Sequence, residues 1–271
     1  MKNHKLAITL TLWCLILSGC DTHVTQTTSG REYLSDYPTG TSIQPDDSFE
    51  EQLKEIASVE PTLQFPARIG IVRIENGDLG NLHESEASAW MKIRDSLGGV
   101  FGEFVPVSPL IADMVYEPTT ENKYRTKPGE IIKKIRLAAA RQHLDVVLIY
   151  EVFSQTETTT LASSVAAWTI LGGYFIDSKK IETVGFANAL LIDVRSGYPY
   201  GSASSSLEAE RDSPFFQSFD STRNLARDNE IATAIKLSKE VEKMMLNLMK
   251  EINGLPKPIT ERTATSRPIA G

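Results

Sequence analysis

Cysteine is nearly absent from the sequence: the 271 residues include two, Cys14 and Cys20, both close to the N-terminus. Beyond Cys20 the chain therefore has no thiol for a disulfide, for a nucleophile or for a soft metal site. We expect the packing of an apolar core, rather than covalent cross-links, to stabilise the fold.

Histidine is scarce as well, and no two of the four histidines stand at the spacing of a metal site. His83-Glu84 begins like the H-E-x-x-H motif of zinc proteases, but Ala87 occupies the position of the second histidine. Residues 98–102 are rich in glycine but follow a predicted helix, whereas a phosphate-binding loop precedes one. The Gly-x-Ser-x-Gly turn of many hydrolases is missing too. The sequence thus predicts no enzyme activity, no metal and no cofactor.

Basic residues are in the minority, with 28 lysines and arginines against 35 acidic residues and a formal net charge of −7. Binding to nucleic acid requires clustered lysine and arginine that neutralise phosphates, and the sequence shows no such cluster. We therefore expect no nucleic-acid partner. For the same reason, no basic run predicts a lipid-binding surface.

Long apolar runs are also few, and the clearest one lies at the N-terminus. Lys2 and Lys5 precede an uncharged stretch over residues 6–17, which is followed by Leu17-Ser18-Gly19-Cys20. Twelve apolar residues are too few for a spanning helix, which needs ~20. A basic start, a short apolar core and small residues before the cut are typical of a secretory signal. Leu17, Ser18, Gly19 and Cys20 form a lipobox, so we expect cleavage after Gly19 and covalent lipid on the Cys20 thiol.

The predicted anchor places the mature protein in a bacterial cell envelope, facing the periplasm. Residues 1–19 contain two lysines and no acidic residue, so the mature chain would carry 26 basic and 35 acidic residues, a charge of −9. Asp21, directly after Cys20, resembles a sorting signal that retains lipoproteins in the inner membrane. The inner membrane is therefore favoured, and the outer membrane stays open.

Composition divides the mature chain into three parts. Residues 20–60 are polar and predict a lipidated flexible tether, residues 61–252 a single domain, and residues 253–271 a disordered tail. Within the domain, apolar patterning predicts strands over 68–74, 104–107, 145–153, 184–194 and 198–210, and helices over 84–97, 128–143 and 223–252. The order β-α-β-α-β-(insert)-β-β-α predicts a mixed-sheet α/β sandwich, since the last strand pair is an antiparallel hairpin. The last helix has a predicted buried face made of Ile231, Ile235, Val241, Met245, Leu248 and Ile252.

The predicted insert, residues 158–176, carries no charged side chain and includes Trp168, Tyr174 and Phe175. Three interpretations stay open at this point: packing in the core, a surface for a partner or for self-association, and a hairpin in contact with a membrane.

Six segments occur in a characteristic order: residues 33–38, 63–72, 144–150, 168–174, 186–196 and the helix that ends near 252. In this series the chain resembles the rhombotarget lipoproteins, a bacterial family without an implied molecular activity, over residues 31–252. More distantly, its element order is similar to the periplasmic domains of curli-export channel lipoproteins and penicillin-binding-protein activator lipoproteins. That likeness implies binding of protein partners or assembly into rings, and no enzyme activity.

Together these observations predict a membrane-anchored lipoprotein that binds or scaffolds an envelope protein complex without catalysing a reaction. Its partners would be the membrane, through the lipid, and one or more envelope proteins. The first alternative is a homo-oligomeric secretion-pore or assembly component that uses residues 158–176 as its contacting hairpin. A hydrolase is the second alternative, and it would require a pocket with converging titratable side chains.

Overall fold

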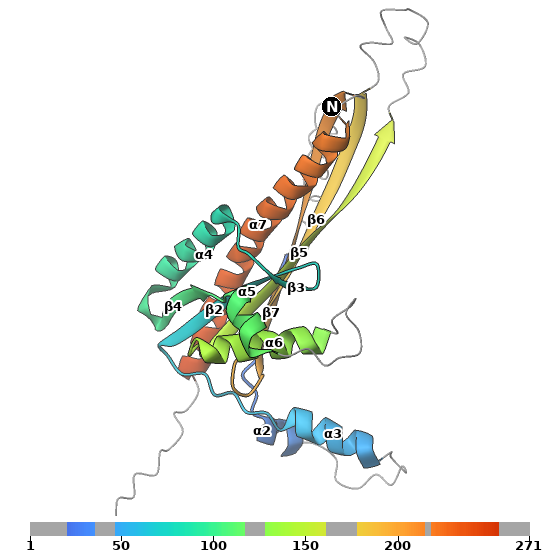
Figure 1. Cartoon of the computed structure of the whole chain (residues 1–271). Coiled ribbons are helices and arrows are strands. Elements are labelled where there is room, and N and C mark those ends of the chain that lie inside the picture. The colour runs from blue at the N-terminus through green and yellow to red at the C-terminus, as the bar shows by residue number, and fades with distance from the viewer. Residues whose placement is uncertain (1–20, 36–46, 117–127, 161–177, 215–217, 255–271) are drawn as a thin grey trace, which may run out of the picture.

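The computed structural model describes residues 21–35, 47–116, 128–160, 178–214 and 218–254 (Figure 1). They form a mixed α/β fold around a seven-stranded sheet with the order β1-β7-β6-β5-β2-β3, in which β4 also pairs with β2. The predicted fold class is confirmed.

The centre of the sheet is built from parallel strands that alternate with helices. β2 (Ala67–Glu75) pairs in parallel with β5 (Val146–Thr160) on one side and with β4 (Phe101–Pro106) on the other. The β5 residues from Val146 to Tyr150 are all buried, as their continuous apolar run predicts. β3 (Asp78–Gly80) returns antiparallel to β2 after a turn in which Asn76 and Gly77 both have positive φ.

On the β5 side of β2, the sheet continues through three long antiparallel strands. β5 pairs with β6 (Ser178–Asp193) through Thr160↔Lys179, and β6 pairs with β7 (Pro199–Pro214) through Ser178↔Pro214. The predicted turn between β6 and β7 contains Gly197, whose φ of 78° suits glycine.

Helices cover both faces of the sheet (Figure 1). On one face lie α4 (Glu84–Leu97), a 3₁₀ turn (Gly98–Val100) and the long α7 (Ser218–Gly254), which runs along β5, β6 and β7. On the other face lie α5 (Pro109–Val115) and α6 (Pro128–Arg141). Each face has its own apolar core: Trp90, Leu148 and Leu237 belong to the first, Ile135 and Val147 to the second.

The predicted flexible tether over residues 20–60 is wrong for a large part of its length. β1 (Thr22–Thr25) is a strand of the sheet, and α2 (Gly30–Ser35) and α3 (Asp47–Ala57) are helices. The polar composition predicted a tether, but β1 joins the sheet through backbone hydrogen bonds at the sheet edge. Such pairing does not require apolar side chains. Figure 1 shows α2 and α3 beyond one end of the sheet, apart from the helices that cover it.

The buried face of α7 is also rotated relative to the prediction. Val241, Met245 and Leu248 are buried as expected, but Ile231 and Ile235 are half-buried. Buried polar residues replace them along the first half of the helix: Asn229, Thr233 and Ser238. There the helix lies so near β6 that a Cβ at Gly185 would stand 2.2 Å from the Thr233 hydroxyl oxygen, so small and polar side chains occupy the point of closest approach.

Candidate interaction site

The segment that follows the predicted lipid attachment residue is docked onto the sheet. β1 pairs antiparallel with β7 in a register that joins Thr22 to Ser204 and Thr25 to Gly201. A Cβ at position 201 would stand 2.5 Å from the carbonyl oxygen of Val24, so the glycine allows the two backbones to approach. The chain is thus part of the fold from its first described residues onward.

Polar side chains of α7 hold the same segment from the other side. The Asp21 carboxylate lies 3.0 Å from the Lys236 Nζ, and this lysine also donates to the Ser206 carbonyl at 2.9 Å. The His23 ring contacts the buried Glu240 at 3.3 Å and the Asn247 amide at 3.1 Å. Ion pairs and hydrogen bonds at partly buried positions fix the register of a strand that has little apolar surface of its own.

Two tyrosines of β7 continue this attachment beyond β1. The Gln26 N–H donates to the Tyr200 carbonyl at 2.9 Å, and the Tyr198 hydroxyl donates to the Thr28 carbonyl at 2.7 Å. The two tyrosine rings lie 5.0 Å apart. They connect the N-terminal segment to the turn between β6 and β7.

The Tyr200 hydroxyl also belongs to a buried polar network around Asp193. It accepts the N–H groups of Thr62 and Leu63, at 2.8 and 2.7 Å, while the Thr62 hydroxyl donates to the Asp193 carboxylate at 2.7 Å. Burial opposes ionisation of this carboxyl, but hydrogen bonds from Ser196 and Thr62 outweigh it, so the Asp193 pKa lies below its ordinary value. Burial and the neighbouring Asp193 raise the pKa of Tyr200 to about 12. A neutral tyrosine beside an ionised carboxylate suits a structural role.

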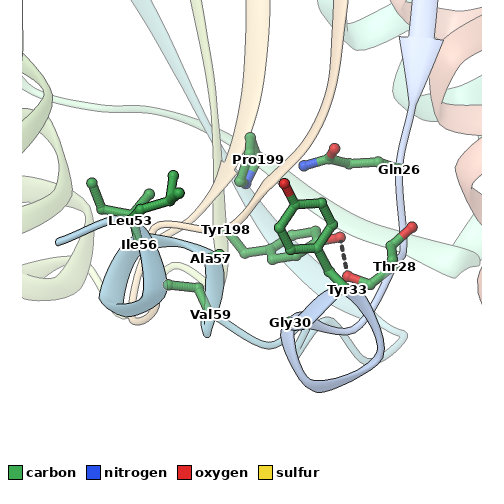
Figure 2. A pocket seen from close by; sticks show the side chains of 10 residues that line it. All are labelled: Gln26, Thr28, Gly30, Tyr33, Leu53, Ile56, Ala57, Val59, Tyr198 and Pro199. Carbon is green, nitrogen blue, oxygen red and sulfur yellow. Dashed lines mark hydrogen bonds between the residues drawn. The ribbon is translucent and has the colours of Figure 1, made fainter. Parts of the chain in front are cut away.

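An apolar pocket of about 420 Å³ lies between α2, α3 and the start of β7 (Figure 2). Figure 2 shows Leu53 and Ile56 on one side of it and Tyr33 facing them from the other. Its lining residues are Gln26, Thr28, Gly30, Tyr33, Leu53, Ile56, Ala57, Val59, Tyr198 and Pro199. The docked N-terminal segment therefore forms one wall of the pocket.

The apolar side chains of α3 are unusually exposed. Phe49 is 61% exposed and Ile56 74% exposed, and together with Leu53 they follow the spacing of one helical face. Tyr33 of α2, across the pocket, is 52% exposed. Single exposed apolar residues are ordinary, but several gathered around one pocket are typical of an interaction surface.

A second buried polar cluster lies under α4 and was not predicted from the sequence. Arg73 of β2 pairs with Glu86 of α4, whose other carboxylate oxygen accepts the Tyr150 hydroxyl at 2.6 Å. Glu230 of α7 approaches Arg73 at 3.9 Å. Burial disfavours the arginine charge, but Glu86 outweighs it, so the Arg73 pKa lies above its ordinary value. Because Arg73 and Glu86 are buried, we interpret the cluster as a structural link between the sheet, α4 and α7.

Of the predicted site residues, the structure places Asp21 alone. Leu17, Ser18, Gly19 and Cys20 lie outside the described residues, and so do Trp168, Tyr174 and Phe175. The strands on either side of Trp168, Tyr174 and Phe175 are described, and β5 and β6 remain paired up to Thr160↔Lys179.

The described part of the chain holds no group of three or more histidine, cysteine, aspartate or glutamate residues arranged to bind a metal ion. Among the described residues, no helix combines the length and apolar character needed to cross a bilayer.

The N-terminal docking and the pocket were missed by sequence reasoning. The apolar spacing of Phe49, Leu53 and Ile56 was the available signal for α3. In contrast, β1 pairs with residues that are distant in the sequence. Its own four residues show no pattern that distinguishes a strand from a polar linker.

No family model and no curated protein matches the chain. The resemblance to the rhombotarget lipoproteins therefore stays a prediction.

Several solved structures of bacterial proteins are similar to the chain at low identity. The PelC dodecamer from Paraburkholderia phytofirmans is 12% identical, with 68% of this chain and 91% of that chain covered and a TM-score of 0.32. Rare lipoprotein B from Shewanella oneidensis is 10% identical, with coverages of 67% and 98% and a TM-score of 0.30. Lipoprotein GNA1162 from Neisseria meningitidis is 15% identical, with coverages of 60% and 97% and a TM-score of 0.21.

Proposed function

We propose that this protein is a lipid-anchored, non-enzymatic component of the bacterial cell envelope that binds a protein partner at the pocket between α2, α3 and β7. The observation that carries the proposal is the exposed apolar face of α3 beside this pocket. A pocket of this size accepts one or two apolar side chains of a partner, which is how many protein interfaces are anchored.

Acidic side chains near the pocket indicate which charge the partner should carry. Glu51 and Glu55 are exposed on α3 and Glu50 is half-buried there, and Lys54 is the one basic residue among them. Glu32 adds another exposed carboxylate on α2. An apolar segment that also carries lysine or arginine would therefore match the pocket and its acidic rim, because complementary charge steers association and fixes orientation.

Photo-crosslinking in cells tests this function. A photoreactive amino acid at Ile56 should capture a reproducible envelope protein, and the same probe at Lys92, on the exposed surface of α4, should not. Adding Leu53→Asp to the Ile56 probe should abolish the product by placing a charge in the pocket. Identical products from both probe positions, or none from Ile56, would contradict the proposed binding site.

The alternative function, an oligomeric secretion-pore component, is supported by the β5–β6 hairpin. Its two strands stay paired through Thr160↔Lys179, and the uncharged residues that connect them lie outside the described part of the chain. Rings of a Cys20-less domain in detergent would support this function. A monomer that is soluble without detergent would exclude it.

A further inference from the structure

The distance between the predicted lipid and the folded domain is very short. Asp21 is already paired with Lys236, and Thr22 is the first residue of β1. Cys20 precedes Asp21 directly, so its Cα lies about 3.8 Å from that of Asp21. Acyl chains on Cys20 would therefore enter the bilayer beside the β1–β7 edge, rather than at the end of a long tether.

The side chains around this point carry positive charge. Lys236, Lys239 and Lys243 stand at positions i, i+3 and i+7 of α7, and 3.6 residues per turn puts them on one side of the helix. Lys239 and Lys243 are exposed. This group was not expected from the sequence, in which no run of basic residues is present.

The charge of Asp21 acts on the first and on the last of these lysines. The Asp21 carboxylate pairs with Lys236 at 3.0 Å. The pKa of Lys243 is raised by its hydrogen bond to Glu240 and, to a smaller extent, by the charge of Asp21. Of the acidic groups at this place, Asp21 and Glu240 are engaged with basic side chains or His23, and Glu242 accepts a hydrogen bond from Ser96, while Lys239 is exposed.

We propose that β1, the adjacent edge of β7 and the lysines Lys236, Lys239 and Lys243 form the membrane-facing surface of this protein, in contact with anionic phospholipid headgroups. The inference rests on the lipid anchor of the proposed function. The anchor supplies permanent attachment. The exposed Lys239, which is not engaged by Asp21 or Glu240, adds an attraction of about fivefold in affinity near an anionic surface. The domain thus lies on the bilayer in a fixed orientation.

Depth-dependent fluorescence quenching tests this orientation in the full-length lipidated chain. Because the mature sequence has no free thiol, a single introduced cysteine carries the probe. Lys239→Cys labels the proposed surface, and Lys133→Cys, exposed on α6 over the opposite face of the sheet, is the control with the same loss of charge. Both proteins are reconstituted into vesicles of phosphatidylethanolamine and phosphatidylglycerol that contain a lipid with a quencher on its headgroup.

We expect the probe at position 239 to be quenched several-fold more strongly than the probe at position 133. Val24→Pro should remove this difference, because proline cannot donate a hydrogen bond to β7. With β1 undocked, a flexible linker would separate the lipid from the domain. Asp21→Ala provides a second variant that weakens the docking without proline. Equal quenching at both positions, or a difference that persists in both docking variants, would overturn the membrane-facing surface. The lipid anchor itself would be overturned if mass spectrometry of the wild-type protein showed no acyl groups and the protein did not float with the vesicles.

Discussion

Asp21 and Lys236 connect the residue after the predicted acylation site to the middle of the longest helix, at 3.0 Å. The second Asp21 carboxylate oxygen is buried and has no hydrogen-bond partner. Lys236 is thus the ion-pair partner of this aspartate, and the lysine connects the anchor segment to α7.

The first prediction concerns this pair. Lys236→Ala should lower the free energy of unfolding of the mature domain by about 1 kcal/mol, because both partners are partly exposed and water replaces some of the lost attraction. Urea unfolding followed by circular dichroism measures the change. In an Asp21→Ala background, the same substitution should cost clearly less; an equal cost would show that the pair contributes nothing.

A second prediction concerns the buried Arg73–Glu86 pair. Glu86→Ala leaves the guanidinium in the core without its closest partner, so unfolding should become easier by about 3–5 kcal/mol. Asp95→Ala, which removes an exposed ion pair with Arg94 on the same helix, is the control and should cost less than about 1 kcal/mol. Comparable losses in the two variants would contradict the structural role of the buried pair.

The third prediction is a pH dependence that comes from Asp193. Its pKa is lower in the folded state than in the unfolded state, so ionised Asp193 stabilises the fold at pH values above the unfolded-state pKa. This contribution is lost as the pH falls through the folded-state pKa. Asp193→Asn should therefore lower stability by about 2 kcal/mol at neutral pH and by less in acid. Thermal unfolding of both proteins across pH 7 to pH 3 measures the difference, and parallel curves would rule out Asp193 as the source.

Much of the fold could be predicted because local patterns and tertiary packing agree. α4 begins at Glu84 and ends at Leu97 as expected, since acidic residues favour the helix start and Gly98 ends the helix with a φ of 66°. The alternation of strands and helices then limits the topology. The continuous apolar run after Asp145 correctly predicts a strand that is covered on both faces.

The site could not be predicted to the same extent, because its contacts join distant parts of the chain. The first residues after Cys20 look like a linker until β7 and α7 are placed beside them. Likewise, Arg73 and Glu86 look like surface residues in the sequence, and the pairing that permits their burial is visible only once α4 is packed on β2.

A fourth prediction separates sorting from docking. If the sorting machinery recognises Asp21 as a retention signal, Asp21→Ser should move the protein from the inner to the outer membrane. Lys236→Ala breaks the same ion pair but keeps the aspartate, so it should leave the location unchanged. Membrane fractionation of both variants measures the distribution. Relocation by Lys236→Ala would show that docking, rather than the residue type at position 21, governs location.

The proposed function and the membrane orientation both depend on a lipid on Cys20, and palmitate labelling of the Cys20→Ala variant tests for it. Cys14 cannot replace Cys20, because it lies within the apolar core of the signal and is preceded by the bulky Trp13. We expect strong incorporation of radiolabelled palmitate in the wild-type protein, and neither label nor normal signal cleavage in the variant. Palmitate label that persists on Cys20→Ala would contradict the anchor and the membrane orientation derived from it.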